Sequence, residues 1–317
     1  INHCHDYVMI FRYCLLFIRD GNIFQLSNKK NIYYVKEKFY LDYINMKKIL
    51  ITGGDGQLGH SFSSIYQRKY NILSLGRDKL DITNKDQISK VIEEFQPSII
   101  LNCAAMTDVD NAERNPTLAN EINSLSIKKV LELFNGLFIQ ISTDYVFDGK
   151  DGPFTENALT NPINSYGKSK LAGEKIIEEN SNSWIIVRTN VLFDMNSQAS
   201  FLSWVISSLK INKKINVVDD QINNPVFTDD LSNMIDMFIN KDMRGIYHVG
   251  SDTLCSRYEF AQMIGRTWNL NIDNIYPIKT HSLKKKIKTY IADRPMKSGL
   301  ISNFDLPTIS LKKSLKK

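Results

Sequence analysis

Residues 48–59, Lys-Ile-Leu-Ile-Thr-Gly-Gly-Asp-Gly-Gln-Leu-Gly, constrain the fold more than any other stretch of this chain of 317 residues. Residues 48–52 form an apolar run typical of a buried strand, and residues 58–66 have the apolar spacing of a helix. A strand that passes through glycines into a helix leaves unpaired amide groups in the first helical turn, and these groups bind anions. The glycines are spaced Gly-x-x-Gly-x-x-Gly, so this turn alone fits both a phosphate site and a plain connection.

From residue 46 onward, predicted strands alternate with predicted helices. The strands cover residues 48–52, 71–75, 98–102, 137–142 and 183–188, and the helices cover residues 58–66, 83–95, 111–134 and 166–180. Pro116 marks a start or restart inside the third helical region. This alternation predicts an α/β fold, a Rossmann-type doubly wound parallel sheet that binds ligands at the carboxyl ends of its strands. We expect a Rossmann domain over residues 46–188. A smaller substrate-binding lobe should lie mainly within residues 189–317, with some of its segments returning to the sheet.

The second half of the chain has a less regular pattern. We predict strands at residues 215–218 and 245–249, and helices at residues 228–240 and 256–268. Thr83 with Asp86, and Ser256 with Glu259, are predicted to cap the helices that they begin. His248 is predicted to pack in or beside its strand rather than to act in catalysis.

Residues 1–45 do not share the pattern of the rest. Residues 8–18 are apolar, but they include Arg12 and fall short of the roughly 20 residues that span a bilayer. No small-residue cleavage site follows them, so a signal peptide is not indicated. We interpret residues 1–45 as an N-terminal extension outside the native fold, with Met46 as the natural start.

The formal net charge of +6 is a property of the C-terminal end. Residues 284–317 contain ten Lys/Arg and two Asp/Glu, without the interleaved aromatic residues of a nucleic-acid stacking platform. We therefore expect neither a nucleic-acid nor a membrane partner. The four cysteines lack metal-ligand or disulfide spacing, which indicates a cytoplasmic protein without a metal site. Cys103 is predicted to lie in an apolar strand.

Polar residues follow the predicted strands. Those after the second strand indicate which nicotinamide cofactor the site prefers. Sites that prefer NAD usually place an acidic residue there, whereas this chain has Gly76-Arg77. An arginine can pair with a 2′-phosphate, so NADPH is expected. The acidic residue Asp78 follows directly, so NADH remains an alternative cofactor.

Tyr166 and Lys170 are four residues apart at the start of a predicted helix, so their side chains share one face. We expect the lysine ammonium to lower the pKa of the tyrosine, which could then exchange a proton with a carbonyl oxygen. Thr143, at the end of the fourth strand, could hydrogen-bond the same oxygen. The Tyr-x-x-x-Lys spacing occurs three times, but only this copy follows a threonine at a strand end.

Four motifs together resemble the dTDP-4-dehydrorhamnose reductase family of extended short-chain dehydrogenases/reductases. They are the glycine turn, Asn102-Cys-Ala-Ala, Ser142-Thr-Asp-Tyr-Val-Phe-Asp-Gly149 and Tyr166-Gly-Lys-Ser-Lys-Leu-Ala-Gly-Glu174. The resemblance implies NADPH-dependent reduction of the 4-keto group of a nucleotide-linked 6-deoxy sugar in cell-surface polysaccharide synthesis. It also implies a homodimer, with a Mg²⁺ ion at the dimer contact in some relatives. The sequence does not locate ligands for that ion.

The resemblance assigns roles by matched position. The catalytic residues would be Thr143, Tyr166 and Lys170. The cofactor would contact Tyr166 and Lys170 together with Gly53, Gly56, Gln57, Leu58, Gly59, Arg77, Asp81, Ile82, Ala105, Met106 and Thr107. The substrate would contact Thr143, Asp144, Asn190, Val191 and Arg294.

This chain departs from the family pattern in the substrate half. Val191 stands where the family usually has a tryptophan, and Lys297 stands where an asparagine is common. The sugar or its nucleotide could therefore differ. Two other functions remain open: an epimerase or dehydratase of the same superfamily, and a non-catalytic NADP-binding regulatory subunit like that of methionine adenosyltransferase. Tyr145 after Asp144 disfavours a dehydratase, which normally has Glu there.

Overall fold

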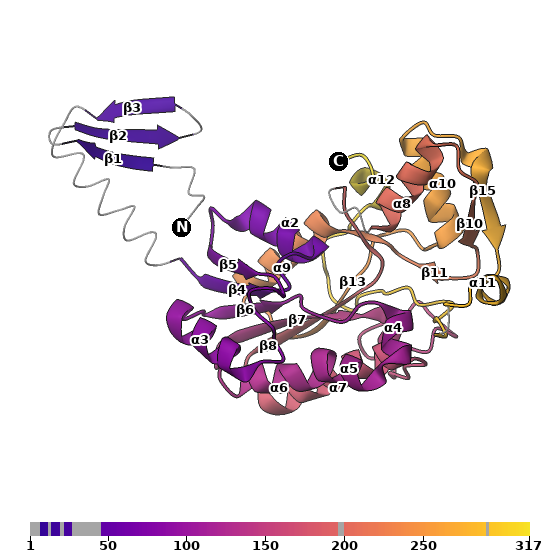
Figure 1. The fold of residues 1–317 in the computed structure, drawn as a ribbon, viewed down its shortest axis with the longest axis horizontal. Coiled ribbons are helices and arrows are strands. Elements are labelled where there is room, and N and C mark those ends of the chain that lie inside the picture. The colour runs from indigo at the N-terminus through magenta and orange to yellow at the C-terminus, as the bar shows by residue number, and fades with distance from the viewer. Residues whose placement is uncertain (1–6, 12–13, 20–21, 27–45, 196–199, 290–291) are drawn as a thin grey trace. The chain divides into compact units, whose positions relative to one another are not determined.

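The computed structural model describes residues 7–11, 14–19, 22–26, 46–195, 200–289 and 292–317. The chain forms two compact units, Ile1–Lys47 and Lys48–Lys317. In the first, β1 (Tyr7–Phe11), β2 (Cys14–Arg19) and β3 (Asn22–Leu26) make an antiparallel sheet (Figure 1). Among the described residues, no helix combines the length and apolar character needed to cross a membrane.

The second unit is built on a parallel sheet of six strands in the order β13-β8-β7-β6-β4-β5. The strands are β4 (Lys48–Thr52), β5 (Asn71–Leu75), β6 (Ile99–Asn102), β7 (Leu137–Thr143), β8 (Trp184–Thr189) and β13 (Gly245–Val249). The parallel sheet predicted from the sequence is confirmed. The strand order reverses between β4 and β6, so the loops after these two strands open the crevice in which such sheets bind ligands.

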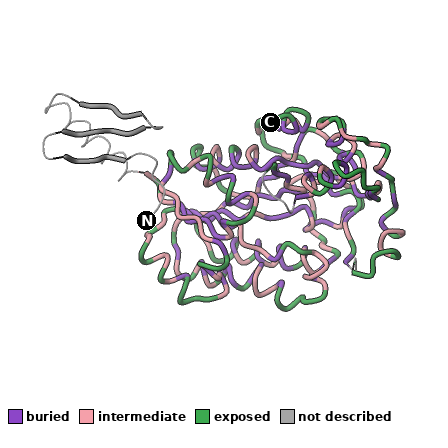
Figure 2. The backbone as a smooth tube through the Cα atoms, turned by 45° about the horizontal axis from the view of Figure 1, so that its top comes forward, coloured by how far each residue is buried: buried purple, intermediate pink, exposed green. Residues whose placement is uncertain are grey.

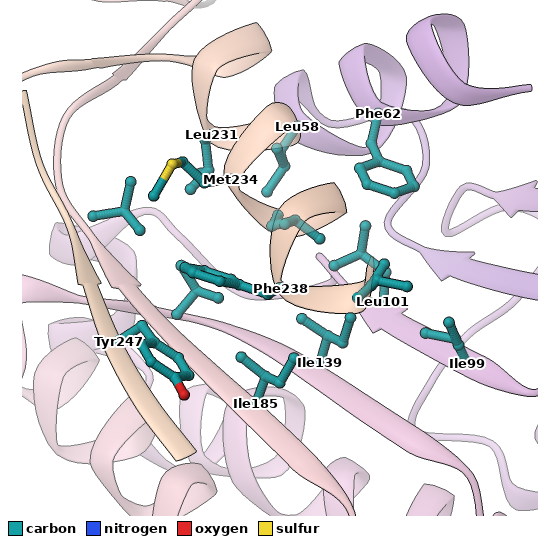
Figure 3. Packing of buried hydrophobic residues seen from close by; sticks show 14 of the residues in the cluster. Leu58, Phe62, Ile99, Leu101, Ile139, Ile185, Leu231, Met234, Phe238 and Tyr247 are labelled. Atoms are coloured by element: carbon teal, nitrogen blue, oxygen red, sulfur yellow. The ribbon is translucent and has the colours of Figure 1, made fainter. Parts of the chain in front are cut away.

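Helices cover both faces of the sheet. On one face lie α2 (Gln57–Tyr66) and α9 (Thr228–Asn240), and on the other lie α3 (Lys85–Phe95), α6 (Ser126–Leu131) and α7 (Ser165–Asn180). Figure 3 shows Phe62 of α2 and Phe238 of α9 above Leu101, Ile139 and Ile185 of the strands. Figure 2 shows the strands as the buried centre of this unit. Because the sheet is apolar on both faces, its strands read as continuous apolar runs.

One sequence prediction about helices was confirmed in part and another was wrong. The helical region predicted at residues 111–134 is divided into α4 (Val109–Arg114), α5 (Pro116–Asn120), the π-helix η1 (Glu121–Leu125) and α6, which confirms the predicted restart at Pro116 but includes a π-helix that was not predicted. Pro116 has no amide hydrogen to continue α4, which explains the first break. The cap of α3 is Asn84, whose side chain accepts from the amides of Asp86 and Gln87, and not Thr83. The Thr83 hydroxyl instead donates to Asp81 Oδ1 at 2.7 Å.

The remaining elements form a smaller lobe with its own core, in which α8 and α10 pack together around Phe193, Phe260 and Ile264. The capping box of Ser256 and Glu259 is confirmed at the start of α10. Outside this lobe, η2 (Asp144–Val146) directly follows β7. The helices of the lobe are α8 (Phe201–Lys210), α10 (Arg257–Thr267), η3 (Ile272–Asn274), α11 (Thr280–Lys286) and α12 (Leu311–Ser314). The strands are β9 (Leu192–Phe193), β10 (Ile215–Val218), β11 (Ile222–Asn223), β12 (Val226–Phe227), β14 (Cys255–Ser256) and β15 (Ile275–Ile278).

Candidate active site

Two cavities adjoin at the carboxyl edge of the sheet, with volumes of about 510 and 440 Å³. Five residues line both of them: Asp55, Gly56, Cys103, Ala105 and Thr107. Cys103, predicted in a strand, follows the end of β6, and burial raises the pKa of its thiol to about 12. The first cavity contains the predicted catalytic residues and the second contains the predicted adenosine side. An elongated ligand would therefore reach from one cavity into the other across the glycine turn.

The glycine turn has the geometry that only glycine permits. Gly53 has φ +64°, and a Cβ on it would lie 2.7 Å from the backbone nitrogen of Ala104. A Cβ on Gly59 would lie 2.9 Å from the Gly53 carbonyl oxygen, so α2 packs directly on the turn. Within the described part of the chain, no side chain caps the start of α2 at Gly56. The first-turn amides of α2 therefore face the cavities available for a phosphate.

The second cavity brings together the predicted adenosine-side residues. Its lining includes Gly53, Gly56, Arg77, Asp81, Ile82, Ala105, Met106 and Thr107. The Asp81 carboxylate accepts hydrogen bonds from the backbone and hydroxyl of Thr83, which lower its pKa. Asp81 is thus ionised at neutral pH, and Arg77 supplies a positive charge to the same cavity.

Asn123 on η1 is a residue that sequence reasoning missed. Its side chain is buried and pairs with both backbone groups of Met106, at 2.8 and 3.1 Å, and with the Ser169 hydroxyl at 2.9 Å. A Cβ on Gly173 of α7 would lie 2.3 Å from the Asn123 carbonyl oxygen. Asn123 therefore ties the cofactor-side loop to the helix that carries Tyr166. Only Gly173, inside the quoted motif, signals this close contact in the sequence.

The three predicted catalytic residues meet at the first cavity. Thr143 ends β7, and Tyr166 and Lys170 lie in the first two turns of α7, which Asn164 caps by accepting from the Gly167 amide at 2.8 Å. The Thr143 and Tyr166 hydroxyl groups lie near each other at this cavity. A Cβ on Gly167 would lie 2.1 Å from the Tyr145 carbonyl oxygen, so only glycine lets α7 start this close to the strand end.

The pKa expectation for Tyr166 was wrong in direction. Burial is the main cause and raises the pKa of the phenol, while the nearby Thr143 hydroxyl opposes the rise. Lys170 is not among the groups that lower the pKa of Tyr166, and its Nζ donates to the Ile141 carbonyl oxygen at 2.7 Å. Burial also lowers the pKa of Lys170 to about 8. At neutral pH, Tyr166 is therefore a protonated phenol, the form that donates a proton.

Asp144 links the C-terminal segment to the site. Its Oδ1 accepts from the Thr143 hydroxyl at 3.1 Å, and its Oδ2 accepts from the Ser298 hydroxyl at 2.5 Å. Burial raises the pKa of this carboxyl group to about 6, with its hydrogen bonds opposing the rise. Asp144 therefore orients Thr143 and fixes residue 298 against the strand end.

The substrate-side residues are divided between cavities. Asn190 and Val191 line the catalytic cavity, as do Gln57 and Leu58, which were predicted to contact the cofactor. Arg294 instead lines a neighbouring cavity of about 500 Å³ and forms a two-point ion pair with Asp110, at 2.9 and 2.8 Å. Arg257 lines both of these cavities, and sequence reasoning missed it, because nothing in its local sequence marks it. His248 is buried in β13, with Nδ1 3.0 Å from the Phe154 carbonyl oxygen, which confirms its predicted packing role.

A family model described as the RmlD substrate binding domain matches residues 46–308. The dTDP-4-dehydrorhamnose reductase of Aggregatibacter actinomycetemcomitans is 35% identical over 228 residues, covering 68% of this chain and 77% of the relative. The methionine adenosyltransferase 2 subunit beta of Bos taurus is 28% identical over 251 residues, covering 73% of this chain and 75% of the relative. The crystal structure of the Bacillus anthracis dTDP-4-dehydrorhamnose reductase in complex with NADP is 34% identical, with a TM-score of 0.80, and covers 86% of this chain and 98% of that one. This chain therefore belongs to the family of the RmlD substrate binding domain.

Proposed function

We propose that this protein is an NADPH-dependent reductase of the 4-keto group of a nucleotide-linked 6-deoxy sugar, converting dTDP-4-dehydrorhamnose to dTDP-L-rhamnose. The observation that carries this proposal is the meeting of Thr143, Tyr166 and Lys170 at a cavity that adjoins the glycine turn. The family relationship and the NADP-bound relative support it. The enzyme would serve cell-surface polysaccharide synthesis in the cytoplasm.

The residues present fit the cofactor. The first-turn amides of α2 suit the pyrophosphate, and Arg77 lines the cavity in which a 2′-phosphate would lie. NADPH supplies the hydride for C4 of the sugar. Tyr166 donates its proton to the carbonyl oxygen, and the Thr143 hydroxyl positions that oxygen. Lys170, one turn away on α7, would reach the nicotinamide ribose, with its Nζ held by the Ile141 carbonyl oxygen.

The relationship to methionine adenosyltransferase 2 subunit beta supports one alternative, a regulatory subunit that binds NADP without turnover. The complete set of Thr143, Tyr166 and Lys170 favours the reductase. A homodimer and a Mg²⁺ requirement are separate proposals from the resemblance. Within the described residues, no group of three or more His, Cys, Asp or Glu side chains is placed to hold a metal ion. An assay with and without EDTA tests the Mg²⁺ requirement.

The test is NADPH oxidation with a panel of 4-keto-6-deoxy nucleotide sugars. Replacing Tyr166 by Phe removes the donated proton and should lower kcat by about 10²- to 10⁴-fold. Tyr66→Phe is the matched control, because its hydroxyl bonds Asn233 of α9 and its side chain lines neither cavity. If the wild-type protein turned over every sugar no faster than Tyr166→Phe does, the regulatory-subunit function would be favoured.

A further inference from the structure

Asp144 binds two hydroxyl groups that come from distant parts of the chain. The Thr143 hydroxyl donates to its Oδ1 at 3.1 Å, and the Ser298 hydroxyl donates to its Oδ2 at 2.5 Å. Thr143 and Asp144 line the catalytic cavity, whereas Ser298 is 2% exposed and lines neither this cavity nor the two beside it. The Ser298 hydroxyl can therefore act on the reaction only through Asp144.

The Thr143 hydroxyl has one hydrogen to donate, and Asp144 accepts it. The Thr143 oxygen accepts from the Tyr145 amide at 3.2 Å. In the proposed function the same hydroxyl positions the ketone oxygen, which is also an acceptor. Thr143 must therefore turn its hydrogen from Asp144 to the ketone. This turn takes a donor away from a buried carboxylate, which is costly.

The C-terminal segment holds Ser298 in place independently of the catalytic threonine. The Ser298 amide donates to the Ile222 carbonyl oxygen at 2.9 Å. Gly149 has φ +71°, and a Cβ on it would lie 2.3 Å from Pro295 Cβ, so the segment packs directly against the loop after η2. The Ser298 donor is thus preorganised, and it stays on Asp144 when the threonine turns away.

The groups around Asp144 make the Ser298 bond important to its charge. Burial raises the pKa of this carboxyl group to about 6, and the side chains that oppose the rise are Ser298, Thr143 and, at the start of α10, Arg257. Tyr166 acts from α7, and the Asp144 charge contributes to its raised pKa. Ser298 has the largest effect of the opposing side chains, so its removal should raise the pKa of Asp144 further.

We propose that Ser298 is a positioning residue for the reduction: it holds the Asp144 carboxylate while Thr143 turns its hydrogen to the ketone oxygen. Without the Ser298 hydroxyl, the carboxylate depends on Thr143 and retains its hydrogen. Thr143 then stabilises less well the negative charge that develops on the ketone oxygen before Tyr166 protonates it. This inference rests on the proposed 4-keto reduction.

The test measures kcat and KM of Ser298→Ala from pH 5 to pH 8 with NADPH and the 4-keto-6-deoxy nucleotide sugar that wild type reduces best. At pH 8 Asp144 is ionised, and kcat should be about 10- to 100-fold below wild type, the effect of one hydrogen bond to a charged group. KM should stay within about 3-fold, because Ser298 does not line the catalytic cavity.

The loss of kcat should shrink as pH falls. At pH 5 Asp144 is protonated, and its own O–H can donate to Thr143 Oγ1, which frees the threonine hydrogen for the ketone. Ser298 is then no longer needed to hold a charge. We expect kcat of Ser298→Ala to lie within about 3-fold of wild type at pH 5.

Ser302→Ala is the matched control, because Ser302 lies on the same C-terminal segment and donates to Glu156 Oε1 at 2.6 Å. It removes the same kind of serine–carboxylate bond, but neither Ser302 nor Glu156 lines the catalytic cavity. The control should keep wild-type kcat and KM at every pH. Urea unfolding of both variants checks that each is folded.

A second comparison places Ser298→Ala in an Asp144→Asn background. The asparagine amide carries no charge and can donate to Thr143 in place of accepting its hydrogen. Ser298→Ala should therefore lower kcat by less than about 3-fold in this background at pH 8, although it lowers kcat at least about 10-fold in wild type.

A loss of kcat in Ser298→Ala that is equal at pH 5 and pH 8 would overturn this inference, because it would indicate a general structural role. Wild-type kcat of Ser298→Ala at pH 8 would also overturn it. Both results leave the proposed function standing, since wild type then reduces the sugar. Failure of wild type to reduce any of the sugars would overturn the proposed function, and this inference with it.

Discussion

Glu174 and Arg188 form a buried ion pair beneath the catalytic residues. Arg188 Nη2 lies 2.7 Å from Glu174 Oε2, and Arg188 Nε lies 3.0 Å from Glu174 Oε1, with both side chains at most 4% exposed. The Ser142 hydroxyl donates to the same carboxylate, and the Phe147 ring lies under the guanidinium at 5.3 Å. The pair therefore fastens α7, which carries Tyr166, to strands β7 and β8.

Arg188→Met should be strongly destabilising. It leaves the Glu174 carboxylate buried with only the Ser142 hydroxyl as a described partner, and breaking a buried pair in this way costs about 3–5 kcal/mol. The free energy of unfolding from urea titration measures the loss. The double variant Glu174→Gln with Arg188→Met should recover part of it, since no buried charge remains. A loss below about 1 kcal/mol in Arg188→Met would contradict this account.

Lys170→Met should stabilise the fold while it abolishes activity. Burial lowers the pKa of Lys170 from 10.5 to about 8, so keeping it charged at pH 7 costs about 3 kcal/mol. Methionine removes that cost but also the bond to the Ile141 carbonyl oxygen, worth about 1 kcal/mol. We expect a net gain of about 2 kcal/mol at pH 7, measured by urea unfolding.

The stability advantage of Lys170→Met should shrink as pH rises. Between pH 8 and pH 10.5 the folded protein has released the Lys170 proton and the unfolded chain has not, so wild-type stability rises with pH relative to the variant. The advantage of Lys170→Met should therefore disappear by pH 10. A pH-independent advantage would show that packing, and not the buried charge, causes it.

The sheet could be predicted from the sequence because its strands are apolar on both faces and end in polar motifs. Residues 48–52 and 71–75 are strands at the predicted bounds. The residue that caps a helix was harder to predict. Asn84 and Thr83 are adjacent residues that can both cap a helix, and only the folded backbone selects Asn84. Propensity likewise gives no sign that the 111–134 helix contains a π-helical turn.

The catalytic trio could be predicted because motif spacing and strand position both indicate it. Asn123, Arg257 and the Asp144–Ser298 bond could not, because each depends on residues that meet only across the fold. The pKa of Tyr166 was predicted with the wrong sign for the same reason. Spacing along a helix places Lys170 nearby, but burial, which is set by the whole fold, has the larger effect.

Asp144→Asn should change how stability depends on pH. The folded-state pKa of Asp144 is raised to about 6 from an ordinary value of 3.8, so the unfolded chain loses this proton first as pH rises. Wild-type stability should therefore fall by up to about 3 kcal/mol between pH 4 and pH 7 relative to the asparagine variant. Urea unfolding of both proteins at pH 4, 5, 6 and 7 checks the difference. Parallel curves would contradict a raised pKa.

Arg77→Ala should change the cofactor preference. Arg77 lines the adenosine-side cavity, where its guanidinium could bond a 2′-phosphate, an interaction worth about 1.5–3 kcal/mol. Asp55 lines the same cavity, and a Cβ on Gly76 would lie 1.5 Å from its Oδ2, so this carboxylate lies against the end of β5. Asp55 thus stands close to the position of the acidic residue in NAD sites, which would let NADH bind.

We expect Arg77→Ala to lower kcat/KM for NADPH by about 10- to 100-fold and to leave kcat/KM for NADH within about 3-fold. Lys79→Ala is the control, because Lys79 is an exposed cation two residues away that does not line the cavity. It should change neither value by more than about 2-fold at 0.15 M salt, at which distant exposed charges are screened. An equal loss with both cofactors in Arg77→Ala would mean that Arg77 acts on the fold of the turn and does not bind the 2′-phosphate.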